Sequence, residues 1–277
     1  MNDIRYGPLT QPAILAFSGP DATRYLNGQL TQDVSAADHD RALPSCITNA
    51  KGKLEYFVRV TAGPEPETIW ISLPADQSDG LRDRLERYLI ADEVEITDLT
   101  GTWQHAHADQ PDPTATLSRR APGPFGDGYD HWWPSDDTPS LTPLTPEQIE
   151  YEEIVNGWPR WNHELTPGML PPEAGLDSSA ISYQKGCYIG QEVLSRIKSI
   201  GRVNRRLAIF QVPATAQNGD PIFSGEKPVG TLTRVARAAP NEDTTHALGY
   251  LKKTAYESSD FSLNPATAKT VIRLRWA

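Results

Sequence analysis

Hydrophobic and polar positions follow strand and helix spacings through residues 13–98. Residues 13–18 form a short apolar run ended by Gly-Pro, which is typical of a buried strand. In residues 79–90 the apolar side chains recur at helical spacing, opposite a face of Arg, Asp and Glu. Two β-rich runs within residues 43–63 flank the sequence NAKGK, which indicates a hairpin.

The same patterns predict the remaining elements of this part: a helix over residues 22–30, after a possible N-cap at Asp21, and strands over residues 68–73 and 93–97. The resulting order is strand, helix, strands, helix, strand. This order is that of a split βαβ, so the sequence predicts a ferredoxin-like layer.

The chain changes character over residues 102–147, which hold eight prolines and few periodic apolar positions. This composition predicts long loops around one strand-like piece at residues 127–134. His105, His107 and His131 fall in this region, and an HxH pair can ligate a metal. Because no acidic or cysteine partner stands nearby at metal-site spacing, the sequence favours a solvated loop over a metal site.

Helix and strand signals return after this region. Thr145 as N-cap, Pro146 at the first helical position and Gly157 as a stop predict a helix over residues 145–157. From residue 207 the pattern is wholly β, with short strands separated by Gly, Pro, Asn and Asp. This spacing predicts a small barrel or sandwich of about 70 residues.

Composition narrows the possible functions. The chain has 277 residues, a formal net charge of -10 and a pI near 5.1, so its surface as a whole repels phosphate polymers. Its two cysteines, Cys46 and Cys187, are too few for a disulfide framework or an all-protein zinc or iron–sulfur site. The first residues lack a basic segment followed by an apolar core, so we expect no secretory signal, and no apolar run approaches the ~20 residues of a membrane span. We therefore expect a cytoplasmic protein.

The stretch YQKGCYIGQE (183–192) carries the candidate chemistry. Its glycines allow a sharp turn, and the apolar positions that follow it predict a helix. A helix N-terminus and the adjacent Lys185 both favour thiolate over thiol at Cys187. Lone cysteines in reducing compartments are more often inert core residues, so that alternative stays open for Cys187. Cys46, inside an apolar strand pattern, is predicted to be a core residue.

Five cations follow within an acidic chain: Arg196, Lys198, Arg202, Arg205 and Arg206. They are either the cationic end of a helix with a solvated strand edge, or an anion site for carboxylates or phosphates. A tRNA-contacting module over residues 196–206 is a further possibility, which the net charge of -10 disfavours.

The segment KGCYIGQE (185–192) resembles the signature of the YgfZ-type folate-binding proteins, whose mitochondrial relatives act in iron–sulfur cluster assembly. Both groups are related to the aminomethyltransferase (T-protein) of the glycine cleavage system. Other segments resemble the same family in the same order, so that the resemblance spans nearly the whole chain: residues 17–34, 49–60, 170–207, 228–236 and 246–253.

The resemblance implies an α+β fold, a three-lobed cloverleaf of the aminomethyltransferase folate-binding type around a central channel that accepts tetrahydrofolate. It implies ferredoxin-like layers and a small C-terminal β-barrel. The corresponding domains are residues 1–100, the ferredoxin-like part of the folate-binding region; residues 101–202, a folded middle lobe ending in the motif and its helix; and residues 203–277, the barrel.

The implied function is a tetrahydrofolate-binding protein that supports assembly or repair of iron–sulfur proteins, including tRNA-modifying enzymes. Such a protein is an accessory factor rather than a classical enzyme. Its expected partners are a folate and iron–sulfur client proteins; direct nucleic-acid contact, a membrane and a resident metal are not expected. The alternative is a tetrahydrofolate-dependent aminomethyl or one-carbon transferase.

The resemblance gives Cys187 a functional role, with Lys185 beside it. The rest of the motif is Gly186, Tyr188, Gly190, Gln191 and Glu192. A folate has a flat pteridine and a carboxylate tail, and therefore needs an aromatic slot and a cation. The expected folate contacts are Tyr188, Trp158, Trp161, Tyr56, Arg196 and Arg202.

Two departures from the family bear on mechanism. Tyr56 and Phe57 stand about where the aminomethyltransferases carry acidic residues, and strand alternation turns Glu55 to the opposite face from Tyr56. This argues against glycine-cleavage chemistry. Glu153 and Val155 stand where the family often has Arg and Glu, so pteridine recognition is expected to differ or to be weak.

Overall fold

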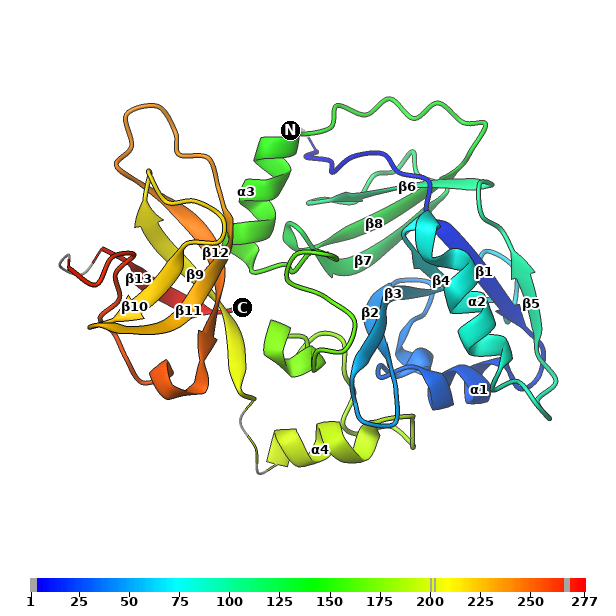
Figure 1. Cartoon of the computed structure of the whole chain (residues 1–277). Helices are drawn as coiled ribbons and strands as arrows, with labels where there is room; N and C mark the ends of the chain where they lie inside the picture. The colour runs from blue at the N-terminus through cyan, green and yellow to red at the C-terminus, as the bar shows by residue number, and fades with distance from the viewer. Residues whose placement is uncertain (1–3, 200, 202, 267–269) are drawn as a thin grey trace. The chain divides into compact units, whose positions relative to one another are not determined.

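The computed structural model describes residues 4–199, 201, 203–266 and 270–277 (Figure 1). Contacts divide the chain into two compact units. Unit 1 is the chain up to Leu144 together with Asp177–Ser195, and unit 2 is Thr145–Leu176 together with Arg196–Ala277. The three-part division at residues 100 and 202 stays a prediction.

The first sheet of unit 1 has five antiparallel strands in the order β2-β3-β4-β1-β5. Strand β1 lies between β4 and β5, which α2 connects, so these elements form the predicted split βαβ and the ferredoxin-like layer is confirmed. The elements are β1 (Ala13–Ser18), α1 (Ala22–Gln29), η1 (Val34–Ala36), β2 (Leu43–Thr48), β3 (Leu54–Ala62), β4 (Ile69–Leu73), η2 (Ala75–Gln77), α2 (Ser78–Glu86) and β5 (Glu95–Asp98).

One face of this sheet and the apolar faces of α1 and α2 form a common core. Leu15 and Phe17 of β1 pack with Leu26 of α1 and with Leu81 and Leu85 of α2, and all five side chains are fully buried. Their burial at i, i+2 spacing in the strand and i, i+4 spacing in the helix reproduces the sequence pattern. This core fixes the end of α1 and the β2–β3 hairpin, the two places that hold the cysteine motif.

The prediction of loops over residues 102–147 is wrong, because this region contains a second, three-stranded sheet. Strands β6 (Trp103–Ala108), β7 (Leu117–Gly123) and β8 (Gly126–Pro134) pair in the order β6-β8-β7. The prolines lie between strands or near strand ends, where they remove few ladder hydrogen bonds. The folded middle region that the family resemblance implied is therefore present.

Unit 2 begins with α3 (Pro146–Asn156), as the sequence predicts. The Thr145 side chain accepts a hydrogen bond from the Gln148 amide, and the Gln148 side chain accepts one from the Thr145 amide, forming a capping box. Gly157 ends the helix in a left-handed conformation with φ of 71°. The one-turn helix η3 (Pro171–Ala174) follows.

The C-terminal part of unit 2 is a five-stranded antiparallel sheet in the order β10-β11-β12-β9-β13. Among the described residues no pairing joins β10 to β13, so the sheet is open and the predicted small barrel is not confirmed. The elements are β9 (Arg205–Pro213), β10 (Pro221–Ser224), β11 (Lys227–Val235), β12 (Thr244–Lys252), η4 (Lys253–Ala255) and β13 (Ile272–Trp276).

Candidate functional site

The cysteine motif forms an irregular loop that leads into helix α4 (Gln191–Ser199). Cys187 is exposed in this loop, whereas Cys46, in the middle of β2, is fully buried. Burial raises the pKa of the Cys46 thiol to about 12, so that thiol is inert at neutral pH. Because α4 begins at Gln191, Cys187 precedes the first turn of the helix. The exposed thiol is the one available for chemistry.

Lys185 anchors the motif loop to the end of α1. Its ammonium donates three hydrogen bonds of 2.8 Å, to the carbonyl oxygens of Asn27, Leu30 and Gln32. A lysine ammonium has three donors, and all three are used here. The carbonyls at the end of a helix carry partial negative charge and lack helical partners, so a cation stabilises them. Burial lowers the pKa of Lys185 to about 8, which leaves it mainly protonated at pH 7.

Lys185 therefore binds three backbone carbonyls, which its place in the sequence did not indicate. The predicted effect of Lys185 on the Cys187 thiolate stays a prediction. What the structure adds is that the cation beside Cys187 holds the loop through the backbone of residues 27–32.

The β2–β3 hairpin supports the other side of the motif loop. Thr48 donates a hydrogen bond of 2.6 Å from its hydroxyl to the Ile189 carbonyl, and the Ile189 amide donates one to the Gly28 carbonyl. Gly190 has φ of 90°, and a Cβ there would lie 2.6 Å from the Asn49 carbonyl oxygen. Only glycine satisfies both the conformation and the close approach. Figure 1 shows the tip of this hairpin beside the start of α4.

The two glycines of the motif thus have different roles. Gly190 is required by backbone geometry, but a Cβ on Gly186 would meet no atom within 4 Å. Gly186 is exposed, next to exposed Cys187, so the segment around the thiol is open to an approaching molecule. The side chain of Gln191 donates a long hydrogen bond of 3.5 Å to the Gly186 carbonyl, and Glu192 is exposed on α4.

Tyr188 lies buried behind the thiol. Its side chain is 6% exposed, and the Lys185 ammonium lies 5.2 Å from the centre of its ring. Burial raises the pKa of the Tyr188 hydroxyl to about 12. Within the part of the chain that the structure describes, this hydroxyl has no hydrogen-bond partner. A buried unsatisfied hydroxyl is a feature that a bound molecule can complete.

The other predicted folate contacts are distributed over both units. In unit 1, Tyr56 is half-buried on β3. In unit 2, Trp158 and Trp161 are half-buried after α3, and Arg196 is exposed on α4. Arg202 lies outside the described residues. Their joint role in binding folate stays a prediction.

The structure explains Glu153 in α3, which stands where the family that the sequence resembles often has Arg. Glu153 accepts hydrogen bonds from Arg234 and from Arg160, and Arg234 is also paired with Glu164 at 3.1 Å. Arg234 is fully buried, and it also donates a hydrogen bond to the Trp158 carbonyl. Burial opposes its charge, but Glu164 and Glu153 raise the pKa of the guanidinium. Arg234 therefore connects α3, the following loop and β11 through buried ion pairs.

A second buried polar group lies in the middle sheet, where the sequence predicted solvated histidines. Asp130 is fully buried and contacts His107 Nδ1 at 2.8 Å, His105 Nε2 at 3.1 Å and Arg59 Nε at 2.8 Å. Burial alone would raise the pKa of Asp130, but Arg59 and His105 hold it well below its usual value. Among the described residues no group of three metal-ligating side chains is assembled.

The chain is similar to proteins named for iron–sulfur cluster assembly and for tRNA modification. No family model matches it. It is 27% identical over 236 residues to a mitochondrial iron–sulfur cluster assembly factor IBA57 homologue of Neurospora crassa, covering 74% of this chain and 53% of that protein. It is 25% identical over 281 residues to the tRNA-modifying protein YgfZ of Aliivibrio fischeri, covering 91% of this chain and 86% of that protein. These proteins are homologues of this chain.

The fold is that of an aminomethyltransferase. The crystal structure of the glycine cleavage system aminomethyltransferase T from Bartonella henselae matches 98% of this chain and 84% of that chain with a TM-score of 0.76. The sequence identity is 14%, so this likeness shows the fold alone. The chain spans about half the length of three IBA57 homologues that it matches, since 53% or 54% of each of these relatives is covered.

No helix in the described part of the chain has the length and apolar character needed to cross a membrane.

Proposed function

We propose that this chain is a tetrahydrofolate-binding protein that supports the assembly or repair of iron–sulfur proteins, with Cys187 as its functional thiol. The observation that carries the proposal is the exposed Cys187 in a loop fixed by Lys185 and Gly190. A positioned, accessible thiol can bind iron or react with another thiol, whereas a thiol kept only for packing is buried. The homologues named for iron–sulfur assembly and tRNA modification supply the context.

The clients that we propose are iron–sulfur enzymes, including those that modify tRNA. Cys187 is the one exposed cysteine of the described residues, and no group there could hold a metal by itself. A cluster or an iron ion would therefore be cargo, shared with ligands from a client or with a small external thiol. This arrangement suits a protein that contacts a cluster for a short time during assembly or repair.

Tetrahydrofolate fits the chemistry of the motif. The buried, unpaired hydroxyl of Tyr188 can hydrogen-bond the polar edge of a pteridine, and Tyr56 offers a half-buried aromatic ring on β3. When bound, the folate supplies a carrier for a one-carbon unit. The residues of this chain would orient it and shield it from water.

The residues of β3 argue against a true aminomethyltransferase. That reaction class is the runner-up because the fold is shared with such an enzyme. Tyr56 and Phe57, at the positions where those enzymes carry acidic residues, supply no carboxylate. The neighbouring Glu55 does have one, but it is paired with Arg84 at 2.8 Å. The described part of β3 therefore has no carboxylate free to act on a bound folate.

Complementation in a bacterium lacking its own YgfZ-type protein tests the proposal. We expect the chain to restore the modified nucleosides made by an iron–sulfur tRNA-modifying enzyme, measured by mass spectrometry of digested tRNA. Cys187→Ser should lose this rescue, whereas Cys46→Ala, which changes the buried thiol, should keep it at equal protein abundance. Tetrahydrofolate binding is measured separately by calorimetry on the purified chain.

Two results would overturn the proposal. One is full rescue by Cys187→Ser. The other is clear tetrahydrofolate-dependent turnover of an aminomethyl or methyl donor that survives this substitution, since it would favour the transferase.

A further inference from the structure

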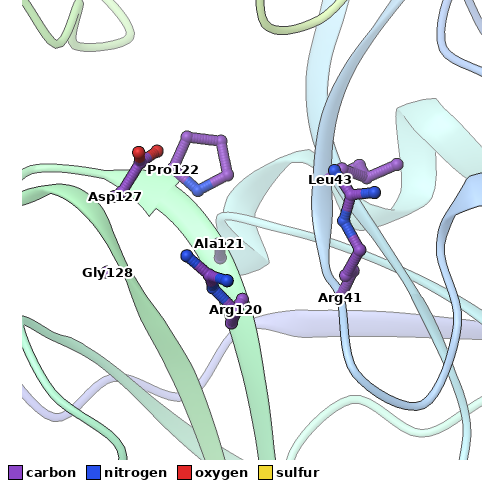
Figure 2. A pocket seen from close by; sticks show the side chains of 7 residues that line it. All are labelled: Arg41, Leu43, Arg120, Ala121, Pro122, Asp127 and Gly128. Atoms are coloured by element: carbon purple, nitrogen blue, oxygen red, sulfur yellow. The ribbon is translucent and has the colours of Figure 1, made fainter.

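Unit 1 contains a pocket that none of the predicted site residues line. Its volume is about 350 Å³, and it lies between the segment entering β2 and strands β7 and β8. The lining residues are Arg41, Leu43, Arg120, Ala121, Pro122, Asp127 and Gly128 (Figure 2). This volume is in the range of small-molecule sites, which span about 300–1,000 Å³.

Two arginines on neighbouring backbone segments give the pocket its charge. Arg41 and Arg120 are partners in a parallel β-bridge, held by hydrogen bonds from the Ala42 amide to the Arg120 carbonyl and from the Arg120 amide to the Asp40 carbonyl. Figure 2 shows their side chains on the walls of the pocket, with the Asp127 carboxylate beyond Pro122. The backbone therefore places two arginines at one opening.

Neither guanidinium has a hydrogen-bond or ion-pair partner among the residues that the structure describes, and both arginines are exposed. Like charges directly opposite each other on paired strands are destabilising. This chain has 36 acidic and 26 basic residues, so unpaired neighbouring arginines are unusual in it. An anion between them would remove the repulsion.

The floor of the pocket includes two apolar side chains. Leu43 and Ala121 are buried and apolar. The His107 ring lies against Gly128 but does not line the pocket, since a Cβ at Gly128 would lie 2.6 Å from His107 Nε2. This nitrogen is buried, and the described residues provide no hydrogen-bond partner for it. Burial also lowers the pKa of His107, which favours its neutral form.

We propose that this pocket binds a small molecule through its carboxylate groups, with Arg41 and Arg120 as the anchoring cations. A guanidinium presents two parallel N–H donors that match the two oxygens of a carboxylate. Two such groups at one opening suit a dicarboxylate, and Asp127 across the pocket accepts an N–H from the same ligand. An N-acyl glutamate has this combination of two carboxylates and one amide N–H.

Two sources provide this chemistry: the glutamate tail of a folate, or a free dicarboxylate. The inference does not depend on the proposed function, because it rests on the arginine pair and the cavity. The two ligands can be distinguished experimentally, because a folate carries a pteridine and a free dicarboxylate does not.

Calorimetric titration of the purified chain tests the proposal with three probes. N-(p-aminobenzoyl)glutamate carries the tail alone, 5-formyltetrahydrofolate carries tail and pteridine, and pteroic acid lacks the glutamate. We expect p-aminobenzoylglutamate to bind, and Arg41→Gln and Arg120→Gln each to weaken its binding about tenfold or more, because each removes a charge-assisted hydrogen bond. Arg237→Gln, an exposed arginine of unit 2, is the matched control and should leave binding unchanged.

The folate probes identify the source. If Arg41→Gln and Arg120→Gln also weaken 5-formyltetrahydrofolate but not pteroic acid, the ligand is the folate tail. If they weaken only p-aminobenzoylglutamate, the pocket takes a free dicarboxylate and is separate from the folate site. The proposal is overturned if p-aminobenzoylglutamate does not bind, or if it binds equally to both variants; either result leaves the folate and Cys187 experiments unaffected.

Discussion

Lys185 shows how a single side chain can hold a loop that contains no regular structure. Its three hydrogen bonds join the motif to residues 27–32, which are far away in sequence. The motif loop is also joined to α1 by the Ile189 amide and to the hairpin by Thr48. The position of the Cys187 thiol thus depends on a few specific polar contacts.

We expect Lys185→Met to destabilise the protein by about 2–4 kcal/mol, because it leaves buried carbonyls without a donor at about 1–3 kcal/mol each. Urea denaturation measures the change. Lys51→Met, at the exposed hairpin turn, is the control and should stay within about 0.5 kcal/mol. An unchanged midpoint in Lys185→Met would mean that water replaces the ammonium without cost.

At the scale of single residues, the sequence predicted the turn around Cys187 and the core position of Cys46, and the functional role of Cys187 stays a prediction. Cys46 is buried, as its apolar strand pattern indicated, whereas the exposure of Cys187 was left open by the sequence. The partners of Lys185 could not be predicted, because they are backbone carbonyls from another element. Backbone groups carry no signature in the sequence, so only the fold shows which of them a lysine will reach.

Single elements were predicted best where a local signal marks their ends. Helix α3 has the predicted cap at Thr145 and the predicted stop at Gly157 because both act through neighbouring backbone groups. The middle sheet was missed because its inward-facing side chains include His107, Asp130 and His131. Their polarity hides the strand pattern, and the charge of Asp130 is compensated from another sheet by Arg59.

Arg234 offers a test of how far α3 depends on β11. Replacing it with Gln removes the cation between Glu153 and Glu164, both of which are buried. Breaking a buried ion pair by removing one partner costs about 3–5 kcal/mol, and we expect a loss of this size. Chemical denaturation followed by tryptophan fluorescence measures it.

Arg237→Gln, three residues after Arg234, beyond the end of β11 and exposed to solvent, should change stability by no more than about 0.5 kcal/mol. Equal stability of the two variants would show that the buried cluster contributes little beyond packing.

For the whole molecule, the net charge of -10 limits the partners that electrostatics alone can attract. The basic segment 196–206 was the one sequence feature that suggested RNA binding. In the structure Arg205 is paired with Glu173 at 2.7 Å, and the Arg206 guanidinium lies 5.4 Å from the centre of the Trp276 ring. These arginines already have partners within unit 2.

We therefore expect no tight binding of unmodified tRNA, even at low salt, in a filter-binding assay. Tight binding that weakens steeply as salt is raised, and that Arg205→Gln reduces, would contradict this expectation, because it is the signature of phosphate contacts.

At the same scale, the order of strands and helices in the first sheet follows from the sequence, but closure of the last sheet does not. The short strands and turns after residue 207 were recognised, yet the described pairings leave β10 and β13 as edges. Edge pairing depends on twist and register, which strand spacing does not encode. The aminomethyltransferase fold was inferred from the family motif rather than from periodicity.

The different exposure of the two cysteines also allows local opening of the chain to be measured by thiol labelling. A thiol reagent added to the native protein meets one accessible sulfur, while the other sits in the middle of β2. Uptake of a first label reports the state of the motif loop, and uptake of a second reports how often β2 separates from the first sheet of unit 1. A ligand that stabilises the folded state of unit 1 should slow labelling of Cys46. Mass spectrometry of the intact chain follows the labelling of both cysteines without an introduced reporter.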